Sequence, residues 1–160
     1  MADFSHINEN GHPVMVDVSS KAETLRTAVA QSIVILPDVV LAKLVDGDIT
    51  TKKGAVFQTA MIAGIMAAKK TGELIPLCHP LGLDNCQVII RINEQKEVVI
   101  ECTASLLAKT GVEMEALVGA SVAALTVYDM CKAFSHDIII KETKLLAKSG
   151  GKQDFTRNPA

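Results

Sequence analysis

The segment Val112–Phe134, "VEMEALVGASVAALTVYDMCKAF", decides the fold, because it predicts one long helix that is apolar nearly all round. Glu113 and Glu115 fall in its first turn, and Asp129 and Lys132 fall in its last. A helix on the surface of a protein would show one apolar stripe and one polar face. This helix should therefore be covered on several sides, with its charges exposed only at the two ends.

The two charged ends are too far apart to meet within one chain. Glu115 and Asp129 are fourteen residues apart, which corresponds to about 21 Å along a helix. At roughly 100° per residue, they lie within about 40° of the same helical face. Because no small ligand spans that distance along one helix, a chemical site that uses both ends must be built from two copies of the chain.

The composition also favours an associating protein. A chain of 160 residues suits a single domain that buries about two-thirds of its unfolded surface. Hydrophobic residues make up 49% and the mean hydropathy is +0.30, yet aromatic residues make up only 3%. This apolar excess in small and aliphatic side chains indicates a subunit interface.

Charge and cysteine usage exclude several classes of function. With 16 basic and 18 acidic residues the net charge is −2, so the sequence predicts no nucleic-acid binding, and any affinity for anions must come from local lysines. The four cysteines form no CxxC pair, which favours reduced thiols in a cytoplasmic protein. Cys78 and His79 are adjacent, which is poor spacing for chelation, so no metal site is expected.

Membrane insertion is also disfavoured by the sequence. The longest uncharged stretches, such as residues 54–68, fall short of the roughly 20 residues that a spanning helix needs. The N-terminus shows no basic and apolar signal peptide. We therefore expect a soluble protein without a membrane partner.

The order of elements predicts a ferredoxin-like α+β sandwich, with one antiparallel sheet and helices packed on one face. Period-two alternation marks two strands joined by a hairpin at "NEQK". We expect a single domain over 1–160, made of an irregular segment 1–21, a strand 24–36, a short helix from Pro37 to about 46–48, a loop and an apolar helix within 51–70, strands 86–92 and 98–106, the long helix, a strand within 137–151 and a frayed tail 153–160.

Two loops carry candidate chemistry. In "TKKGA", residues 51–55, lysines beside a glycine precede a helix N-terminus, which suits a small anion site, although an exposed charged loop explains the same pattern. In "LIPLCHPL", residues 74–81, prolines restrict the backbone and would hold His79 at one defined position. A structural role for this histidine is the alternative.

The helix ends offer further candidates. An acid such as Glu113 suits any helix start. Glu115 points about 200° away from Glu113, so the two side chains cannot lie on the same face of the helix. One of them can therefore cap the helix while the other faces a ligand. Asp129 and Lys132 can pair at i,i+3, either as an ordinary surface ion pair or as a partly buried pair that exchanges a proton with a ligand. The apolar helix favours the second interpretation.

The motifs "LIPLCHPL", "KTGVEMEAL", "SVAALTVYDMCKA" and "LLAKSGGK", in this order and after "MVDVSSK", resemble the molybdenum cofactor biosynthesis protein C family of cyclic pyranopterin monophosphate synthases. The resemblance extends from about residue 6 to residue 152. It implies a ferredoxin-like subunit in a homohexamer, a trimer of dimers, with sites at subunit interfaces. This agrees with the argument from helix length.

The resemblance also implies a reaction. The substrate would be 3',8-cyclo-7,8-dihydroguanosine 5'-triphosphate, made by a separate radical enzyme, and the products would be cyclic pyranopterin monophosphate and pyrophosphate. Such a lyase needs proton transfers and neutralisation of a triphosphate, and no redox cofactor. Participation of Mg2+ with the triphosphate and docking of the upstream enzyme stay open. The alternatives are a non-catalytic ferredoxin-like module that binds nucleotide or protein, and a purely structural oligomer.

Residue by residue, the resemblance assigns two groups of site residues. Lysines would hold the triphosphate as point charges, and Glu115 would accept hydrogen bonds from the guanine-derived amino groups. Ala55 and Met61 depart from the family pattern, which has an acid and an arginine there. The implied catalytic residues are Asp129, Lys132, Lys53 and His79, and the implied substrate-binding residues are Leu77, Cys78, His79, Glu113, Met114, Glu115, Asp17 and Lys148.

Overall fold

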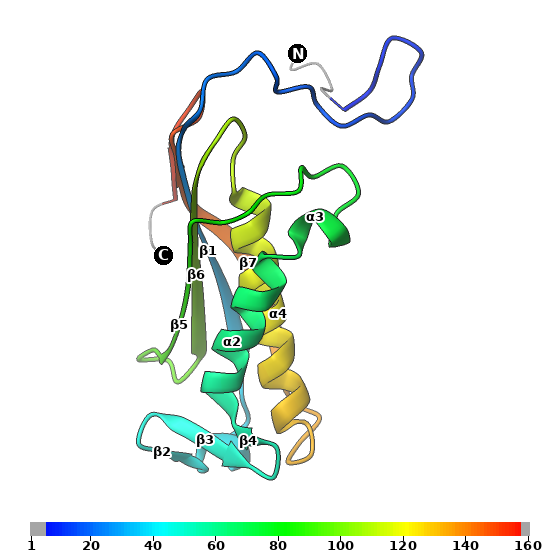
Figure 1. The fold of residues 1–160 in the computed structure, drawn as a ribbon. Helices are drawn as coiled ribbons and strands as arrows, with labels where there is room; N and C mark the ends of the chain where they lie inside the picture. Colours follow the sequence, from blue (N-terminus) through cyan, green and yellow to red (C-terminus); the bar gives the residue numbers. More distant parts are fainter. Residues whose placement is uncertain (1–5, 158–160) are drawn as a thin grey trace.

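A five-stranded antiparallel sheet forms one layer of the molecule in the computed structural model, which describes residues 6–157 (Figure 1). Its strand order is β5-β6-β1-β7-β8, and every neighbouring pair is antiparallel. The strands are β1 (Thr24–Ile35), β5 (Asn85–Ile92), β6 (Val98–Ala108), β7 (Ile139–Ser149) and β8 (Phe155–Thr156). This arrangement confirms the predicted ferredoxin-like α+β class.

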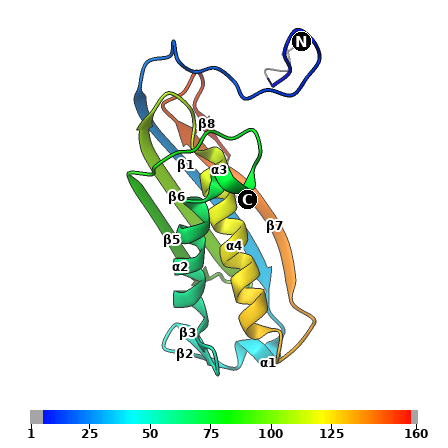
Figure 2. The same ribbon diagram turned by 45° about the vertical axis from the view of Figure 1, so that its right-hand side comes forward.

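Two helices cover one face of this sheet. The long helix α4 (Glu113–Cys131) and the helix α2 (Val56–Ala68) run side by side along the strands, as both views show (Figures 1 and 2). Two single-turn helices, α1 (Asp38–Leu41) and α3 (Thr71–Leu74), flank them. Alternate residues of β1 and β6 point into the layer between sheet and helices, which is why both strands show a period of two.

Two glycines let α2 and α4 approach closely. A Cβ atom added to Gly64 would lie 2.8 Å from the carbonyl oxygen of Gly119, and one added to Gly119 would lie 2.5 Å from Sγ of Cys102. Both distances are too short for real side chains, so only glycine fits at this crossing. The contact fixes the position of α2 relative to α4 and to the sheet.

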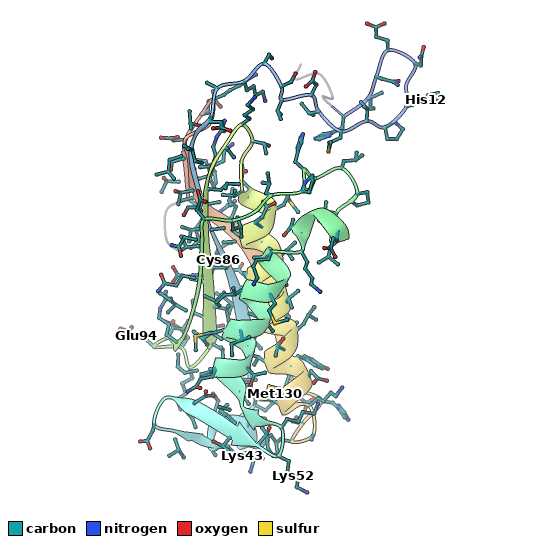
Figure 3. All side chains as sticks on the ribbon, viewed as in Figure 1. His12, Lys43, Lys52, Cys86, Glu94 and Met130 are labelled. Atoms are coloured by element: carbon teal, nitrogen blue, oxygen red, sulfur yellow. The ribbon has the colours of Figure 1, made fainter. Side chains whose placement is uncertain are left out.

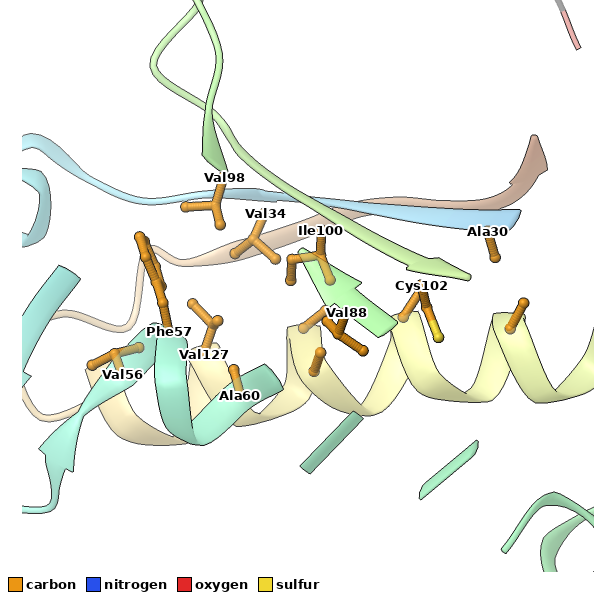
Figure 4. Packing of buried hydrophobic residues seen from close by; sticks show 14 of the residues in the cluster. Ala30, Val34, Val56, Phe57, Ala60, Val88, Val98, Ile100, Cys102 and Val127 are labelled. Atoms are coloured by element: carbon orange, nitrogen blue, oxygen red, sulfur yellow. The ribbon is translucent and has the colours of Figure 1, made fainter. Parts of the chain in front are cut away.

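Small and aliphatic side chains fill the core between the two layers (Figure 4). Phe57 of α2 and Val127 of α4 pack near Val34 and Val98 of the sheet at one end, and Cys102 lies farther along α4. The shortage of aromatic residues is therefore explained by tight packing of the helices against the sheet.

A small second sheet corrects the prediction for residues 37–55. The helix that begins after Pro37 ends at Leu41 and does not reach residue 46. It is followed by β2 (Leu44–Val45), β3 (Asp48–Thr51) and β4 (Gly54–Ala55), paired in that order. Asp46 and Gly47 have φ values of 52° and 83°, which suit a two-residue hairpin turn. The expected loop before α2 is likewise a hairpin.

The chain ends differ in part from the prediction. Residues 6–21 are irregular apart from one bridge between Ile7 and Pro13. The prediction of a frayed tail is wrong for Phe155 and Thr156, which pair with Lys148 and Ala147 of β7. The rest of the calls for the two ends, at 1–5 and 158–160, lies outside the described residues.

Burial, rather than length, identifies α4 as a core helix. Its 19 residues are long and apolar enough to cross a membrane by length and composition, so the length argument made from the sequence is wrong for this helix. However, 56% of its apolar window is buried within the chain. The helix is apolar on most sides because the sheet covers one side and α2 another.

Candidate functional site

The candidate site residues form two groups at opposite ends of α4. The Asp129 cluster, defined as Lys53, Asp129 and Lys132, lies beside the small sheet, where Figure 3 labels Lys52. The Glu115 pocket, defined as the cavity beside Glu115, lies at the other end, under the N-terminal segment. Both groups were expected at the ends of α4, and one chain does not bring them together.

The Asp129 cluster surrounds one carboxylate with two cations. Oδ2 of Asp129 lies 2.8 Å from Nζ of Lys53, and Oδ1 lies 2.7 Å from Nζ of Lys132. Lys132, followed by Lys53, lowers the pKa of Asp129 to about 2, and Asp129 in turn raises the pKa of Lys132. At neutral pH the cluster therefore carries one net positive charge and can attract an anion.

The cluster confirms the i,i+3 pair and corrects its expected burial. The side chain of Asp129 is 51% exposed in the single chain, and that of Lys132 is 50% exposed. A partly buried pair was expected because the helix is apolar on every side before this point. Met130 and Cys131 next to Asp129 are buried, so the helix end itself is packed, and only the side of α4 that carries Asp129 and Lys132 is open to solvent. An exposed ion pair contributes little to the stability of the fold. The charges of this pair are instead accessible to a ligand.

Lys53 reaches Asp129 from a different element. It lies in the tight turn between β3 and β4, where its backbone N–H donates to Oγ1 of Thr51 at 3.0 Å. The hydroxyl of Thr51 donates to the carbonyl of Gly54 at 3.2 Å. These bonds close the turn, so that the lysine side chain extends from a defined backbone toward α4.

The Glu115 pocket is a cavity of about 520 Å³. It is built where four separate segments meet: the N-terminal segment, the loop after α3, the start of α4 and the turn after β7. The lining residues are His6, Val16, Val18, Lys21, Leu77, Cys78, His79, Leu81, Thr110, Gly111, Glu113, Met114, Glu115 and Lys152. Six of the predicted substrate-binding residues therefore share one cavity.

Burial sets the chemistry of this pocket. Glu115 is only 3% exposed, and burial, with a smaller contribution from Glu113, raises its pKa. Burial and then the charge of Glu115 raise the pKa of the Cys78 thiol. Glu115 can thus hold its proton at a higher pH than an exposed glutamate and either donate or accept a hydrogen bond.

His79 ties the loop after α3 to the N-terminal segment. Its Nε2 lies 2.8 Å from the carbonyl oxygen of Val16, and a carbonyl can only accept, so this nitrogen donates. Residues 16–21 are further held by Lys109, whose Nζ donates to the carbonyl of Ser19 at 2.9 Å. The histidine therefore has a structural contact in addition to its place on the cavity wall.

Glu113 links the pocket to β7. Its Oε1 lies 3.0 Å from Nζ of Lys148, and its carboxylate folds over Gly111, where a Cβ atom would collide with it. Lys148 is thus bound to a lining residue, Glu113, but does not line the pocket itself. Asp17 also lies outside that lining; it is exposed and accepts the N–H of Ser19 at 2.8 Å, which lowers its pKa.

Four polar residues of the lining are not among the predicted site residues, although Lys152 ends the motif "LLAKSGGK": His6, Lys21, Thr110 and Lys152. Lys21 closes the motif "MVDVSSK" from which only Asp17 was chosen, so a signal was present. At the two positions that depart from the family pattern, Ala55 ends β4 and Met61 packs half-buried against the core.

Residues 6–157 contain no group of three or more His, Cys, Asp or Glu side chains that could hold a metal ion. All four cysteines are free thiols.

Comparison with known proteins gives consistent matches. The model of the MoaC family matches residues 15–151. The chain is 52% identical to a cyclic pyranopterin monophosphate synthase of Xanthomonas axonopodis pv. citri, over 96% of this chain and 93% of that protein. It is also 52% identical to a molybdenum cofactor biosynthesis bifunctional protein of Synechocystis sp. and 49% identical to molybdenum cofactor biosynthesis protein 1 of Dictyostelium discoideum. It spans 46% and 26% of the length of these two relatives.

Proposed function

The chain belongs to the MoaC family, and from this membership we propose that it is a catalytic member, a cyclic pyranopterin monophosphate synthase. It converts 3',8-cyclo-7,8-dihydroguanosine 5'-triphosphate to cyclic pyranopterin monophosphate and pyrophosphate, as a lyase of molybdenum cofactor biosynthesis. The relative from Xanthomonas, which carries this name and matches over nearly its full length, supports the assignment.

The observation that carries the proposal is the position of Asp129 between two lysines, at 2.8 and 2.7 Å. Phosphate oxygens that bind Lys53 and Lys132 compete with the carboxylate for the same cations. As these contacts weaken, the pKa of Asp129 rises from its low value and the carboxylate becomes able to accept a proton. Triphosphate binding is thereby coupled to general base catalysis.

The Glu115 pocket would bind the guanine-derived part of the substrate. The buried carboxyl of Glu115 suits the exchange of hydrogen bonds with ring nitrogens and amino groups, in a cavity large enough for a bicyclic base. His79 lines the same cavity and would take part in proton transfer. Lys148 and Lys152 add positive charge at its edge.

We propose that two chains complete each site. Glu115 and Asp129 are separated by about 21 Å of helix, while apolar side chains on the helix layer face solvent, including Leu125 at 57% and Ile62 at 60% exposure. A second copy that covers this surface could bring its Asp129 cluster to the first copy's pocket. The proposed assembly is a homohexamer built as a trimer of dimers in the cytoplasm.

The proposed reaction needs no redox cofactor. Binding of Mg2+ with the triphosphate is the open alternative, and turnover measured with and without a chelator tests it. The substrate would come from a radical enzyme upstream, and the bifunctional relative from Synechocystis supports a close link to other activities of this pathway.

The test measures pyrophosphate release and the pterin product from the cyclised triphosphate. The wild type should turn over, whereas Asp129→Asn should bind the substrate, assemble normally and release no pyrophosphate. If the wild type binds the triphosphate without releasing pyrophosphate, the chain is a non-catalytic nucleotide-binding module. If Asp129→Asn is fully active, the catalytic assignment of Asp129 is wrong.

A further inference from the structure

Asp48 opens the strand β3, yet its side chain is bound to the helix α2. Its Oδ1 accepts the N–H of Ile49 at 2.6 Å and that of Phe57 at 2.7 Å, and its Oδ2 accepts the N–H of Gln58 at 3.1 Å. One half-buried carboxylate thus satisfies three backbone donors. Hydrogen bonds from backbone donors to an ionised acceptor are about twice as strong as neutral ones.

The sequence of α2 explains why this contact matters. The N-cap residue is Ala55, whose side chain has no atom that can accept a hydrogen bond, and the first turn contains no acid. The first N–H groups of a helix have no partner within the helix. Asp48 provides from a neighbouring strand the oxygen atoms and the negative charge that an N-cap residue normally provides.

The same bonds fix the hairpin that carries Lys53. Between Asp48 and Phe57 the chain runs up β3, through the turn and down β4. Asp48 closes the base of this hairpin onto α2, and Ile49, which is fully buried, anchors it in the core. Lys53 lies at the tip, so the direction of its side chain depends on the bonds at the base.

The partner of Lys53 lies on an element that α2 already holds in place. Asp129 belongs to α4, and the close crossing at Gly64 and Gly119 fixes α2 against α4. Asp48 also lies near the end of α4, because its charge, after burial, contributes to raising the pKa of Cys131 to about 11. One carboxylate therefore joins the hairpin to α2, and α2 in turn packs against α4.

We infer that Asp48 is a positioning residue for the Asp129 cluster: it caps α2 and thereby holds the β3–β4 hairpin at the angle that places Lys53 against Asp129. This inference deepens the proposed function and rests on it for the catalytic role of Lys53. Asp48 itself does not contact the proposed substrate site.

The direct test reads the environment of Lys53 without any substrate. Lysines of the assembled protein are labelled with an amine-reactive reagent, and the rate at each lysine is measured by mass spectrometry. Asp48→Ala should raise the labelling rate of Lys53 to that seen in Asp129→Asn, because the ion pair is lost in both. Lys52 in the same turn and the exposed Lys70 beyond the other end of α2 should keep their wild-type rates, whereas general loosening of the fold would change both.

Graded variants separate positioning from folding. Asp48→Asn keeps an acceptor oxygen but loses the charge, so its Lys53 labelling should lie between those of the wild type and Asp48→Ala. Asp46→Asn removes an exposed acid two residues away, from a position with φ of 52° that asparagine tolerates, and should leave Lys53 unchanged. If Asp48→Ala fails to fold, the comparison of Asp48→Asn with Asp46→Asn decides.

The catalytic test is a double-mutant cycle. Asp48→Ala should lower kcat about 10-fold or more, since displacement by about 1 Å is costly to a catalytic group. In a Lys53→Gln background the same change should cause little further loss. Unchanged Lys53 labelling in Asp48→Ala, or losses that multiply in the cycle, would overturn the inference. If the wild type releases no pyrophosphate, the proposed function fails while the labelling result still decides the role of Asp48.

Discussion

The two ends of α4 place acids of opposite character on one helical face. Asp129 is half-exposed, and two lysines hold its pKa at about 2. Glu115 is buried, and the loss of solvent raises its pKa. The contrast arises from what surrounds each side chain, because loops cover Glu115, whereas Asp129 lies on the side of α4 that is open to solvent. Two acids whose pKa values are moved apart suit the roles of base and acid in one reaction.

The largest effect should come from removal of the charge at Asp129. Asp129→Asn should lower kcat by about 10³-fold, the usual contribution of a general base, with little change in substrate affinity. Asp137→Asn, an exposed acid beyond the same helix end, is the matched control and should be near wild type in pyrophosphate release. A similar loss in both variants would remove the special role of Asp129.

A smaller loss is expected at the buried end. Glu115→Gln keeps the size of the side chain but can neither ionise nor give up a proton, so kcat/KM should fall about 10- to 100-fold, in keeping with one hydrogen bond to a charged group. Glu73→Gln changes an exposed acid of α3 outside the pocket and should have no effect. Steady-state kinetics on both variants is the measurement. Full kcat/KM in Glu115→Gln would contradict the assignment of this pocket to substrate binding.

The middle of the helix tests the rigid link between the two ends. Gly119→Ala forces a methyl group toward Sγ of Cys102 and should destabilise the fold by about 1–3 kcal/mol. Cys102→Ala in the same chain should recover part of this loss, since it removes the colliding atom. Ser121→Ala, at a half-buried position on the same helix, is the control in chemical denaturation. Equal stability of the Gly119→Ala variant and the wild type would contradict the tight packing of α4 against β6.

The smallest expected effect is a change in the pH dependence of stability. Burial raises the pKa of Glu115 above its ordinary value of 4.5, so the folded chain binds this proton more tightly than the unfolded chain does. The contribution of Glu115 is therefore fully present below pH 4.5 and is lost as the pH rises through the folded pKa. Glu115→Gln should remove this part of the pH profile of the unfolding midpoint. An unchanged profile would mean that Glu115 titrates as an exposed acid.

Much of the fold could be predicted because its elements are long and periodic. The alternation in residues 86–106 and the continuous apolar helix define the sheet and its cover, and the structure matches both. The small sheet at residues 44–55 could not be predicted, because strands of two to four residues carry no clear periodic signal. There the Asp46-Gly47 pair, which marks a hairpin turn, was interpreted as the end of a helix.

The candidate site could be predicted only in part. The motif around Cys78 and His79 and the start of α4 pointed to residues that share one cavity. The contribution of residues 6–21 to that cavity was missed, because a polar segment without periodicity gives no indication of what it covers. The capping of α2 by Asp48 was missed for a similar reason, since the donor and acceptor are nine or more residues apart and belong to different elements.

The central claim is that the Asp129 cluster of one chain meets the Glu115 pocket of another. The most direct test mixes two impaired chains, Asp129→Asn and Glu115→Gln, each with its own tag, under conditions in which subunit exchange is verified. Random pairing leaves one site in four with both native acids, so the account predicts recovery of about a quarter of wild-type activity. Mixed assemblies that are no more active than the average of the two parent variants would contradict it.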